Sequence, residues 1–232
     1  MKSIPMFVLA GGFGTRLRTV VSEVPKPLAP VGNKPFLHYL VKNWIEQGVR
    51  EFIFLLHYEA DQIINYLENS EFKRQIPDLK IGYIVEPEPL GTGGAVKYAL
   101  EHYPVEGDFL VTNADTWLST GIQMLLASSA PNIAAVAVPN VSRYGEVHSK
   151  DGLIKSFSEK RKTDEGGQVN AGMYLLSDDL FAQCAETKFS IETSIFPKLI
   201  AAQKLRATAL ECDFIDIGIP EDYQAFCEWV RR

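Results

Sequence analysis

The chain has 232 residues, of which 46% are hydrophobic and 22% charged, a composition typical of one folded domain or of one domain with a small appendage. Its formal net charge of −6 repels polyanions, which argues against a nucleic-acid partner. The four histidines are scattered and the three cysteines lack Cys-x-x-Cys spacing, which disfavours a zinc site and fits a reducing compartment. No apolar stretch approaches the ~20 residues of a membrane span. We therefore expect a cytoplasmic protein without a membrane partner.

The first part of the chain alternates short apolar runs with amphipathic stretches. Predicted strands lie at 4–10, 52–56, 81–85, 109–112 and 133–138, and predicted helices at 36–48, 61–68 and 93–102. Continuous apolar strands are typical of strands that are buried on both faces. The alternation therefore predicts an α/β fold with a mostly parallel sheet and helices on both of its faces.

After residue 139 the pattern becomes more polar. Shorter strands of a small antiparallel β subregion are predicted at 143–148, 153–158 and 169–176, helices at 179–185, 192–203 and 221–230, and late strands at 205–210 and 214–216. We expect a single domain over residues 1–232, with a core at 1–139. The region 140–232 would then form a smaller subregion that ends in the C-terminal helix.

Three predicted strands end in unusual loops, namely Leu9–Leu17, Glu86–Gly94 and Thr112–Asp115. Ligands in open α/β sheets bind outside the carboxyl ends of the strands, so we expect these loops to converge on one crevice. Glycines in the first loop would let backbone N–H groups approach phosphate oxygens. Leu17 stands where a Rossmann fingerprint has its third glycine, and no Gly-Lys-Ser/Thr follows, so this loop is neither that fingerprint nor a P-loop.

Two basic residues follow the glycine loop. Arg16 stands directly after the turn, and Lys26 lies between Pro25 and Pro27. We expect the two prolines to hold the backbone extended and to fix the direction of the lysine side chain. The combination of glycines, an arginine and a fixed lysine indicates a phosphate site far more specifically than any one of these features.

The chain resembles the sugar-1-phosphate nucleotidylyltransferase family along nearly its whole length. The motifs that carry the resemblance are, in chain order, Leu9–Leu17, Pro25–Val31, Lys34-Pro35, Leu90–Ala95, Asn113–Asp115, Tyr144–Val147, Phe157–Lys160, Asn170–Gly172 and Phe214–Gly218. The resemblance implies a Rossmann-like α/β core. It also implies transfer of a nucleoside monophosphate from a nucleoside triphosphate to a sugar 1-phosphate, with Mg²⁺ and with release of pyrophosphate.

The resemblance also implies roles for individual residues. It gives catalytic roles to Arg16, Lys26 and Asp115, and it implies that Asp115 and Asp216 hold Mg²⁺. Nucleotide binding is implied for Leu9, Ala10, Gly11, Gly12, Gly14, Thr15, Glu86, Gly91, Thr92 and Gly93, and sugar-phosphate binding for Asn113, Gly145, Glu159, Lys160 and Asn170. The segment Ser190-Ile191-Glu192 fits either the sugar pocket or the start of a helix.

One segment departs from the family pattern. The family often reads Arg-Leu-x-Pro-Leu-Thr after the glycine loop, whereas this chain has Arg16–Val21 with the letters RLRTVV. Together with Tyr144-Gly145 and the run Phe214–Tyr223, this variant is similar to the branch of D-glycero-α-D-manno-heptose 1-phosphate guanylyltransferases. That branch implies transfer of GMP from GTP to a heptose 1-phosphate, which would supply surface polysaccharide synthesis.

The base preference has a chemical argument at Glu86. In family members that use UTP or dTTP a glutamine often reads the base from about this position. A carboxylate only accepts hydrogen bonds. Guanine alone among the common bases presents two adjacent donors, N1–H and N2–H₂, so a buried Glu86 would favour GTP. The competing interpretation is that Glu86 points to solvent or caps the following helix.

Other functions stay open at this stage. The chain could be a uridylyl- or cytidylyltransferase for another sugar phosphate, a scaffold that binds sugar nucleotides without turnover, or a catalytically silent regulatory relative. A silent relative should have lost Arg16, Lys26 or a metal carboxylate, and all of these are present. Many relatives form dimers, so a homodimer is a further expectation, although no residue of this chain indicates it.

Overall fold

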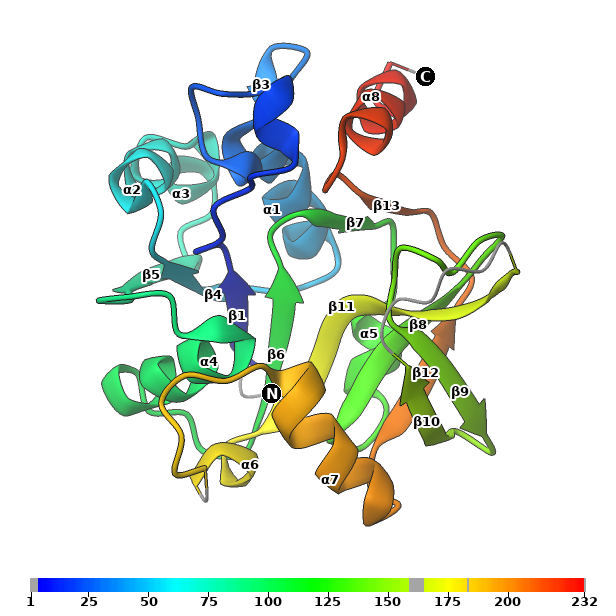
Figure 1. Cartoon of the computed structure of the whole chain (residues 1–232). Coiled ribbons are helices and arrows are strands. Elements are labelled where there is room, and N and C mark those ends of the chain that lie inside the picture. The colour runs from blue at the N-terminus through cyan, green and yellow to red at the C-terminus, as the bar shows by residue number, and fades with distance from the viewer. Residues whose placement is uncertain (1–3, 159–164, 183, 232) are drawn as a thin grey trace. The chain divides into compact units, whose positions relative to one another are not determined.

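The computed structural model describes residues 4–158, 165–182 and 184–231 (Figure 1). The chain forms two compact units, each of which is discontinuous in sequence. Unit 1 consists of Met1–Pro89, Asn113–Trp117 and Ile215–Arg232, and unit 2 of Leu90–Thr112 and Leu118–Phe214. These limits differ from the predicted subregions 1–139 and 140–232, because the C-terminal segment belongs to the first unit and unit 2 begins at residue 90. The assignment of the whole chain to a single domain stays a prediction.

Unit 1 is built on three parallel strands in the order β5-β4-β1 (Figure 1). They are β1 (Met6–Leu9), β4 (Glu51–Leu56) and β5 (Lys80–Val85), and all three lie where strands are predicted. Residues 52–56 are all buried, so both faces of this sheet are covered, as their continuous apolar run predicts. The Ala10 N–H donates to the Leu55 carbonyl at 2.9 Å, which fixes the chain just beyond the end of β1.

The helices of unit 1 are α1 (Phe36–Glu46), α2 (Ala60–Glu68), α3 (Glu71–Gln75) and α8 (Pro220–Trp229). The predicted apolar face of α1 is buried, including Leu40 and Trp44, and the chain leaves this helix at Gly48 with φ +100°. The sequence does not predict α3, because five residues are too few for a periodic signal.

An aromatic cluster attaches α8 to the rest of unit 1. Phe226 contacts Phe36 with ring centroids 4.7 Å apart and Trp117 at 5.5 Å, and Trp117 contacts Trp229 at 5.1 Å. Within the described ranges, the indole N–H of Trp117 is the buried side-chain polar group that lacks a hydrogen-bond partner. Aromatic pairs of this kind contribute about 0.5–1.5 kcal/mol each beyond their buried area.

The loop between β1 and α1 contains two short 3₁₀ helices, η1 (Leu17–Thr19) and η2 (Lys26–Leu28), and the small strands β2 (Pro30–Val31) and β3 (Lys34–Pro35). The extended backbone predicted around Lys26 is found at Pro25 alone, with φ −63° and ψ 149°. Lys26 itself begins η2, because Pro27 fits the first turn of a helix, where its missing N–H is not needed.

Unit 2 contains a mixed sheet in the order β6-β11-β8-β12-β10-β9. Its strands are β6 (Asp108–Asn113), β8 (Asn132–Val138), β9 (Glu146–Lys150), β10 (Leu153–Ser158), β11 (Gly167–Ser177) and β12 (Arg206–Leu210). Among the described pairs β8 and β12 run parallel, and the others run antiparallel. The predicted parallel arrangement thus holds in unit 1, whereas unit 2 is mixed, because β11 lies between β6 and β8 and runs antiparallel to both.

The helices of unit 2 are α4 (Gly91–His102), α5 (Ile122–Leu126), α6 (Asp179–Ala182), the π-helical turn η3 (Ile191–Ile195) and α7 (Phe196–Ala201). The helix predicted at 192–203 is therefore divided into a π-helical turn and an α-helix. Two further short strands, β7 (Thr116–Leu118) and β13 (Phe214–Asp216), lie where the chain passes from one unit to the other.

Two global features follow from these elements. Within residues 4–158, 165–182 and 184–231, every helix is too short or too polar to cross a bilayer. The three cysteines are free thiols, and all three are half-buried.

Candidate active site

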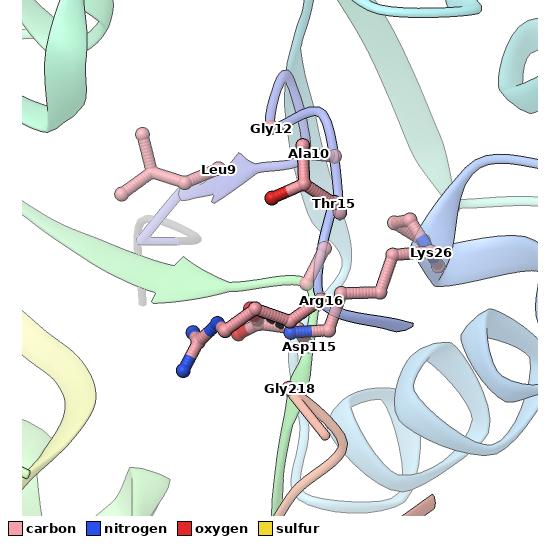
Figure 2. A pocket seen from close by; sticks show the side chains of 11 residues that line it. Leu9, Ala10, Gly12, Thr15, Arg16, Lys26, Asp115 and Gly218 are labelled. Carbon is pink, nitrogen blue, oxygen red and sulfur yellow. Dashed lines mark hydrogen bonds and ion pairs between the residues drawn. The ribbon is translucent and has the colours of Figure 1, made fainter. Parts of the chain in front are cut away.

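A cavity of about 190 Å³ lies in unit 1 at the carboxyl end of β1 (Figure 2). It is lined by the glycine loop, by η2 and by the segments around Asp115 and Gly218. Of the lining residues, Pro27, Ala114 and Gly218 are additions to the predicted site, and the others are predicted site residues. The complete lining is Leu9, Ala10, Gly12, Gly14, Thr15, Arg16, Lys26, Pro27, Ala114, Asp115 and Gly218.

The glycine loop presents backbone N–H groups that have no internal acceptor. In the part of the chain that the structure describes, this is true of Gly12, Gly14 and Thr15. Gly14 has φ +60°, a conformation that favours glycine, whereas a Cβ on Gly12 would meet no atom within 4 Å. The packing of the chain therefore does not explain Gly12. Neighbouring free N–H groups of this kind can form a concavity that binds anions.

Two backbone hydrogen bonds bring distant segments to this loop. The Ala114 N–H donates to the Leu9 carbonyl, and the Ile217 N–H donates to the Asp115 carbonyl, both at 3.0 Å. The first bond places Asp115 beside the end of β1, and the second brings the segment that carries Asp216 to Asp115. The two predicted metal ligands therefore meet although about a hundred residues separate them in sequence.

One lysine lies between these two carboxylates. Lys26 Nζ donates a hydrogen bond to Asp115 Oδ2 at 2.6 Å and lies 3.7 Å from Asp216 Oδ1. The Lys26 side chain is only 10% exposed, so this pair of interactions is partly shielded from water. Figure 2 shows Lys26 reaching Asp115 from η2, and Arg16 lines the same cavity.

Gly218 allows both cations to approach the backbone. A Cβ on Gly218 would lie 2.9 Å from Asp216 Oδ1, 3.3 Å from Lys26 Nζ and 3.4 Å from Arg16 Nη2. The Gly218 N–H also donates to Asp216 Oδ1 at 2.8 Å. A side chain at this position would therefore crowd the predicted catalytic groups together.

Burial raises the pKa of Asp216, and the nearby Asp115 carboxylate raises it further. Lys26, the Gly218 N–H and Arg16 act in the opposite direction without cancelling the increase. The carboxylate of Asp216 is therefore held in an environment that disfavours its negative charge. Such a group gains from an additional cation nearby.

The two aspartates fit a Mg²⁺ ion. Magnesium prefers oxygen ligands and commonly takes one or two carboxylates from the protein, with phosphate oxygens and water completing its shell. Asp115 and Asp216 already face one cationic group, the Lys26 ammonium, which shows that a positive charge is accommodated between them. No cluster of three or more His, Cys, Asp or Glu side chains suited to a metal occurs among the described residues.

Glu86 is buried against the glycine loop. Its residue surface is 7% exposed, and its Oε1 would lie 3.1 Å from a Cβ placed on Gly11. His57 packs beside Glu86 and Gly11. Its Nδ1 lies 3.1 Å from the Glu86 carbonyl oxygen, and its Cβ would lie 3.2 Å from a Cβ placed on Gly11. Glu86 therefore does not point to solvent, and a side chain at Gly11 would crowd its carboxylate.

The predicted nucleotide residues Gly91, Thr92 and Gly93 belong to unit 2, at the start of α4. The Gly93 N–H and the Gly94 N–H both donate to the Phe189 carbonyl, at 2.9 and 3.1 Å. A Cβ on Gly93 would lie 2.2 Å from the Phe189 ring. These glycines thus have a packing role, and whether Gly91, Thr92 and Gly93 also bind nucleotide stays a prediction.

The predicted sugar-phosphate residues are distributed over both units. Asn113 lies half-buried in unit 1, at the end of β6. Gly145 and Asn170 lie together in unit 2, where the Asn170 N–H donates to the Gly145 carbonyl at 2.9 Å. Glu159 and Lys160 lie outside the described residues.

Comparison with known proteins places this site in a family. Residues 6–230 match the family model described as nucleotidyl transferase. The chain belongs to the nucleotidyl transferase family. The α/β fold predicted from the sequence is also that of solved relatives, including a putative glucose-1-phosphate thymidylyltransferase from Bacillus anthracis with a TM-score of 0.84 at 19% identity.

The nucleotidyl transferase also has relatives of greater sequence similarity. A D-glycero-α-D-manno-heptose 1-phosphate guanylyltransferase from Campylobacter jejuni is 38% identical over 225 residues, which cover 94% of this chain and 96% of the relative. A protein of the same name from Aneurinibacillus thermoaerophilus is 34% identical, with 94% of each chain covered. The crystal structure of HddC from Yersinia pseudotuberculosis complexed with GMP-PN has a TM-score of 0.84 and 36% identity, covering 98% of this chain and 99% of HddC.

Sequence reasoning missed two features of this nucleotidyl transferase. Gly218 is absent from the predicted site residues, although its lack of a side chain lets Lys26 and Arg16 approach. Glu192 was left undecided, yet it accepts hydrogen bonds from Thr92, Tyr174 and Ser190. The signal for Glu192 was the spacing Ser190-x-Glu192, which also describes an ordinary helix cap, and the structure indeed shows Ser190 capping η3.

Proposed function

We propose that the protein transfers GMP from GTP to D-glycero-α-D-manno-heptose 1-phosphate, giving a GDP-heptose and pyrophosphate. The observation that carries this proposal is the pocket in which Lys26 lies between Asp115 and Asp216 beside the glycine loop. The names of the Campylobacter and Aneurinibacillus relatives support the choice of base and sugar. The product would be an activated sugar donor, as surface polysaccharide synthesis requires.

The chemistry is a displacement at the α-phosphorus of GTP. An oxygen of the sugar phosphate forms a bond to this phosphorus, the bond from it to the bridging oxygen breaks, and pyrophosphate leaves with that electron pair. Both reactants are negatively charged, so the protein lowers the barrier chiefly by positioning them and by neutralising charge.

The two cations of the pocket suit different parts of this reaction. We assign Arg16 to the β- and γ-phosphates, because a guanidinium can hold the leaving pyrophosphate through two parallel hydrogen bonds. We assign Lys26 to the α-phosphate, where its ammonium would stabilise the charge that develops during the displacement. The free N–H groups of Gly12, Gly14 and Thr15 would bind phosphate oxygens of the nucleotide. Leu9, Ala10 and Gly11 are also assigned to nucleotide binding.

Asp115 and Asp216 are the residues that would hold Mg²⁺. When bound, Mg²⁺ supplies positive charge to the phosphate oxygens and helps to orient them. The chain itself contributes the carboxylate of Asp216, whose raised pKa reflects burial and the repulsion from Asp115. Asp115 additionally accepts a hydrogen bond from Thr116 Oγ1 at 3.1 Å, which restricts its carboxylate.

Glu86 supports the proposed preference for guanine. Its carboxylate is buried beside Gly11 at the edge of the glycine loop, where an acceptor-only group suits the adjacent N1–H and N2–H₂ donors of guanine. Uracil and thymine would place carbonyl oxygens against this carboxylate. A buried polar group left without its partner is costly, so the wrong base would be rejected.

For the sugar phosphate, the proposal assigns Asn113, Gly145, Glu159 and Asn170 to hydroxyl groups and Lys160 to the phosphate. Polar groups with fixed directions suit a sugar that carries many hydroxyls. Asn170 is held in this way, because its Oδ1 accepts from the Gly172 N–H at 3.0 Å and its Nδ2 donates to the Tyr174 hydroxyl at 2.9 Å.

The deciding experiment is a matrix of pyrophosphate release, with four nucleoside triphosphates against a panel of sugar 1-phosphates in the presence of Mg²⁺. We expect the highest kcat/KM for GTP with the heptose 1-phosphate. A preference for UTP or CTP would replace the proposal with a different nucleotidylyltransferase. Binding of sugar nucleotides without pyrophosphate release would instead support a regulatory or scaffold role.

A further inference from the structure

A chain of hydrogen bonds in unit 2 centres on the carboxylate of Glu192. Its Oε1 accepts from the Tyr174 hydroxyl at 3.0 Å, and its Oε2 accepts from the hydroxyls of Thr92 at 2.7 Å and Ser190 at 2.5 Å. Three separate segments thus donate to one side chain: the start of α4, strand β11 and the turn before η3. In Figure 1 the segment that leads into α7 runs beside the start of α4, and η3 contacts α4.

The direction of each hydrogen bond along this chain is determined. The Gly172 backbone N–H can only donate, so the atom of Asn170 that faces it is the oxygen Oδ1. The amide nitrogen Nδ2 of Asn170 must then face the Tyr174 hydroxyl and donate to it. Since that hydroxyl accepts from Asn170, its own hydrogen is available for the carboxylate of Glu192. Tyr174 is 1% exposed, so no bulk water competes for these positions.

At its other end the chain of hydrogen bonds fixes Thr92. The Thr92 hydroxyl donates to Glu192 Oε2 and accepts from the Ile191 N–H at 2.9 Å. Close packing in the same place keeps the start of α4 against the segment before η3. A Cβ on Gly94 would lie 2.4 Å from the Thr187 carbonyl oxygen, and one on Gly91 would lie 2.6 Å from the Phe189 carbonyl oxygen.

We propose that Glu192 is a positioning residue for the transfer reaction, acting on the sugar phosphate through Tyr174 and Asn170 and on the nucleotide through Thr92. This inference rests on the proposed function, in which Asn170 binds sugar hydroxyls and Thr92 binds nucleotide. In this role Glu192 acts through the three hydroxyl groups that donate to its carboxylate. Its effect is to leave one N–H and one lone pair of Asn170 aimed in a fixed direction.

Steady-state kinetics can test separately the connection from Glu192 to Asn170 and the connection from Glu192 to Thr92. Tyr174→Phe removes the acceptor of the Asn170 amide and one of the three donors to Glu192, but it leaves the bond from Thr92 to Glu192 Oε2 in place. We therefore expect KM for the sugar 1-phosphate to rise about threefold to tenfold, the range of one hydrogen bond, with KM for GTP unchanged. Glu192→Gln keeps the volume but cannot accept on both sides. It should therefore raise KM for both substrates.

Two comparisons distinguish positioning from a merely structural role. Thr208→Val removes a half-buried hydrogen bond in the same unit, from Thr208 Oγ1 to Asn132 Oδ1, and should leave both KM values unchanged. In an Asn170→Ala background, Tyr174→Phe should add less than about twofold to KM for the sugar 1-phosphate, because interacting residues are not additive. Additive effects, or equal effects from Thr208→Val, would overturn the inference.

A second readout does not depend on turnover. The side-chain amide resonance of Asn170, identified by its loss in Asn170→Ala, should shift in both Tyr174→Phe and Glu192→Gln and stay in place in Thr208→Val. Unchanged resonances would refute the positioning role even in an active enzyme. If the wild type releases no pyrophosphate but the resonances shift as expected, the proposed function fails while the control of Asn170 by Glu192 stands.

Discussion

At the scale of residues, the ammonium group of Lys26 is the central group of the candidate active site. Lys26 is shared between Asp115 and Asp216, and Gly218 leaves room for it beside Arg16. Because reaction at phosphorus depends on charge neutralisation, we expect Lys26→Ala to lower kcat by roughly 10²–10³, the usual scale for one stabilising donor. Steady-state pyrophosphate release measures this. The control is Lys34→Ala, since Lys34 pairs with Glu71 outside the pocket and should keep near-normal kcat.

Asp216 connects the proposed Mg²⁺ site with the stability of the fold. Its raised pKa means that the folded state binds more protons than the unfolded state between pH 3.8 and the raised value, so stability falls as pH rises through this window. Without Mg²⁺, Asp216→Asn should therefore raise Tm at neutral pH, and exposed Asp213→Asn should not. Mg²⁺ with GTP should raise the Tm of the wild type and should have little effect on the Tm of Asp216→Asn. The variant should also lose Mg²⁺-dependent turnover.

A lower Tm for metal-free Asp216→Asn than for the metal-free wild type would contradict this account.

The base preference is testable at Glu86. Glu86→Gln gives the side chain a donor that can face a pyrimidine carbonyl, so the ratio of kcat/KM for GTP to that for UTP should fall by about tenfold or more. Glu88→Gln, two residues away and exposed, serves as the matched control. An unchanged ratio in Glu86→Gln would remove the assignment of this residue to guanine.

The residues of the pocket could be predicted to different degrees. A glycine loop, an arginine and a lysine lie within twenty residues, so local sequence indicates a phosphate site. Asp115 and Asp216 could be joined only through the family resemblance, because the two backbone hydrogen bonds that bring them together depend on the fold. Gly218 carries no chemical group of its own, and its importance follows from the distances to its neighbours.

At the scale of elements, the glycine loop contains two glycines of different kinds. The positive φ of Gly14 favours glycine, whereas neither conformation nor packing explains a glycine at Gly12. Gly12→Ala should leave Tm within about 1–2 °C, since its Cβ meets nothing, and should raise KM for GTP about tenfold by approaching a bound phosphate. Gly14→Ala should instead lower Tm by several degrees, because a positive φ costs an alanine about 1–2 kcal/mol. Thermal unfolding and GTP kinetics of both variants check this. A large loss of Tm in Gly12→Ala would show that packing does require that glycine.

Helix α1 carries a buried titratable group. Burial lowers the pKa of His38, and Lys34 and Lys42 lower it further while Glu71 opposes them. The unfolded chain then binds more protons between the lowered value and 6.5, so stability is lost as pH falls below about 6.5. We expect His38→Gln to flatten this part of the pH dependence in denaturant unfolding. The exposed His102→Gln should retain the wild-type slope, and an unchanged slope in His38→Gln would exclude His38 as its source.

Elements were predictable where the sequence pattern is local. Continuous apolar runs located β1, β4 and β5, and helical spacing located α1, because burial of a face leaves a period in the sequence. The position of β11 between β6 and β8 was not predictable, since strand order depends on long-range pairing. The π-helical turn η3 was not predicted either. A π-helical turn contains only slightly more residues than an α-helical turn, so the spacing of apolar residues does not distinguish the two.

On the scale of the whole molecule, the two units do not correspond to the first and second parts of the sequence, because each unit is built from separate segments. Unit 1 takes residues from three separate segments, including the C-terminal helix, whereas composition changes only near residue 139. The predicted phosphate-binding residues Arg16 and Lys26 lie in unit 1 with Asn113, whereas the predicted sugar-binding residues Gly145 and Asn170 lie in unit 2. Sequence order alone could not give this division, because the return of the chain to unit 1 at Ile215 is made by pairing in space.

The positions of the tryptophans determine which part of the protein contributes to its intrinsic tryptophan fluorescence. All three tryptophans, Trp44, Trp117 and Trp229, belong to unit 1, and Trp117 stands two residues after Asp115. Intrinsic indole emission therefore reports on the half of the protein that carries the nucleotide pocket, while unit 2 contributes no signal of this kind. A separate melting of unit 2 would therefore pass unnoticed in tryptophan emission and would have to be followed through its tyrosines.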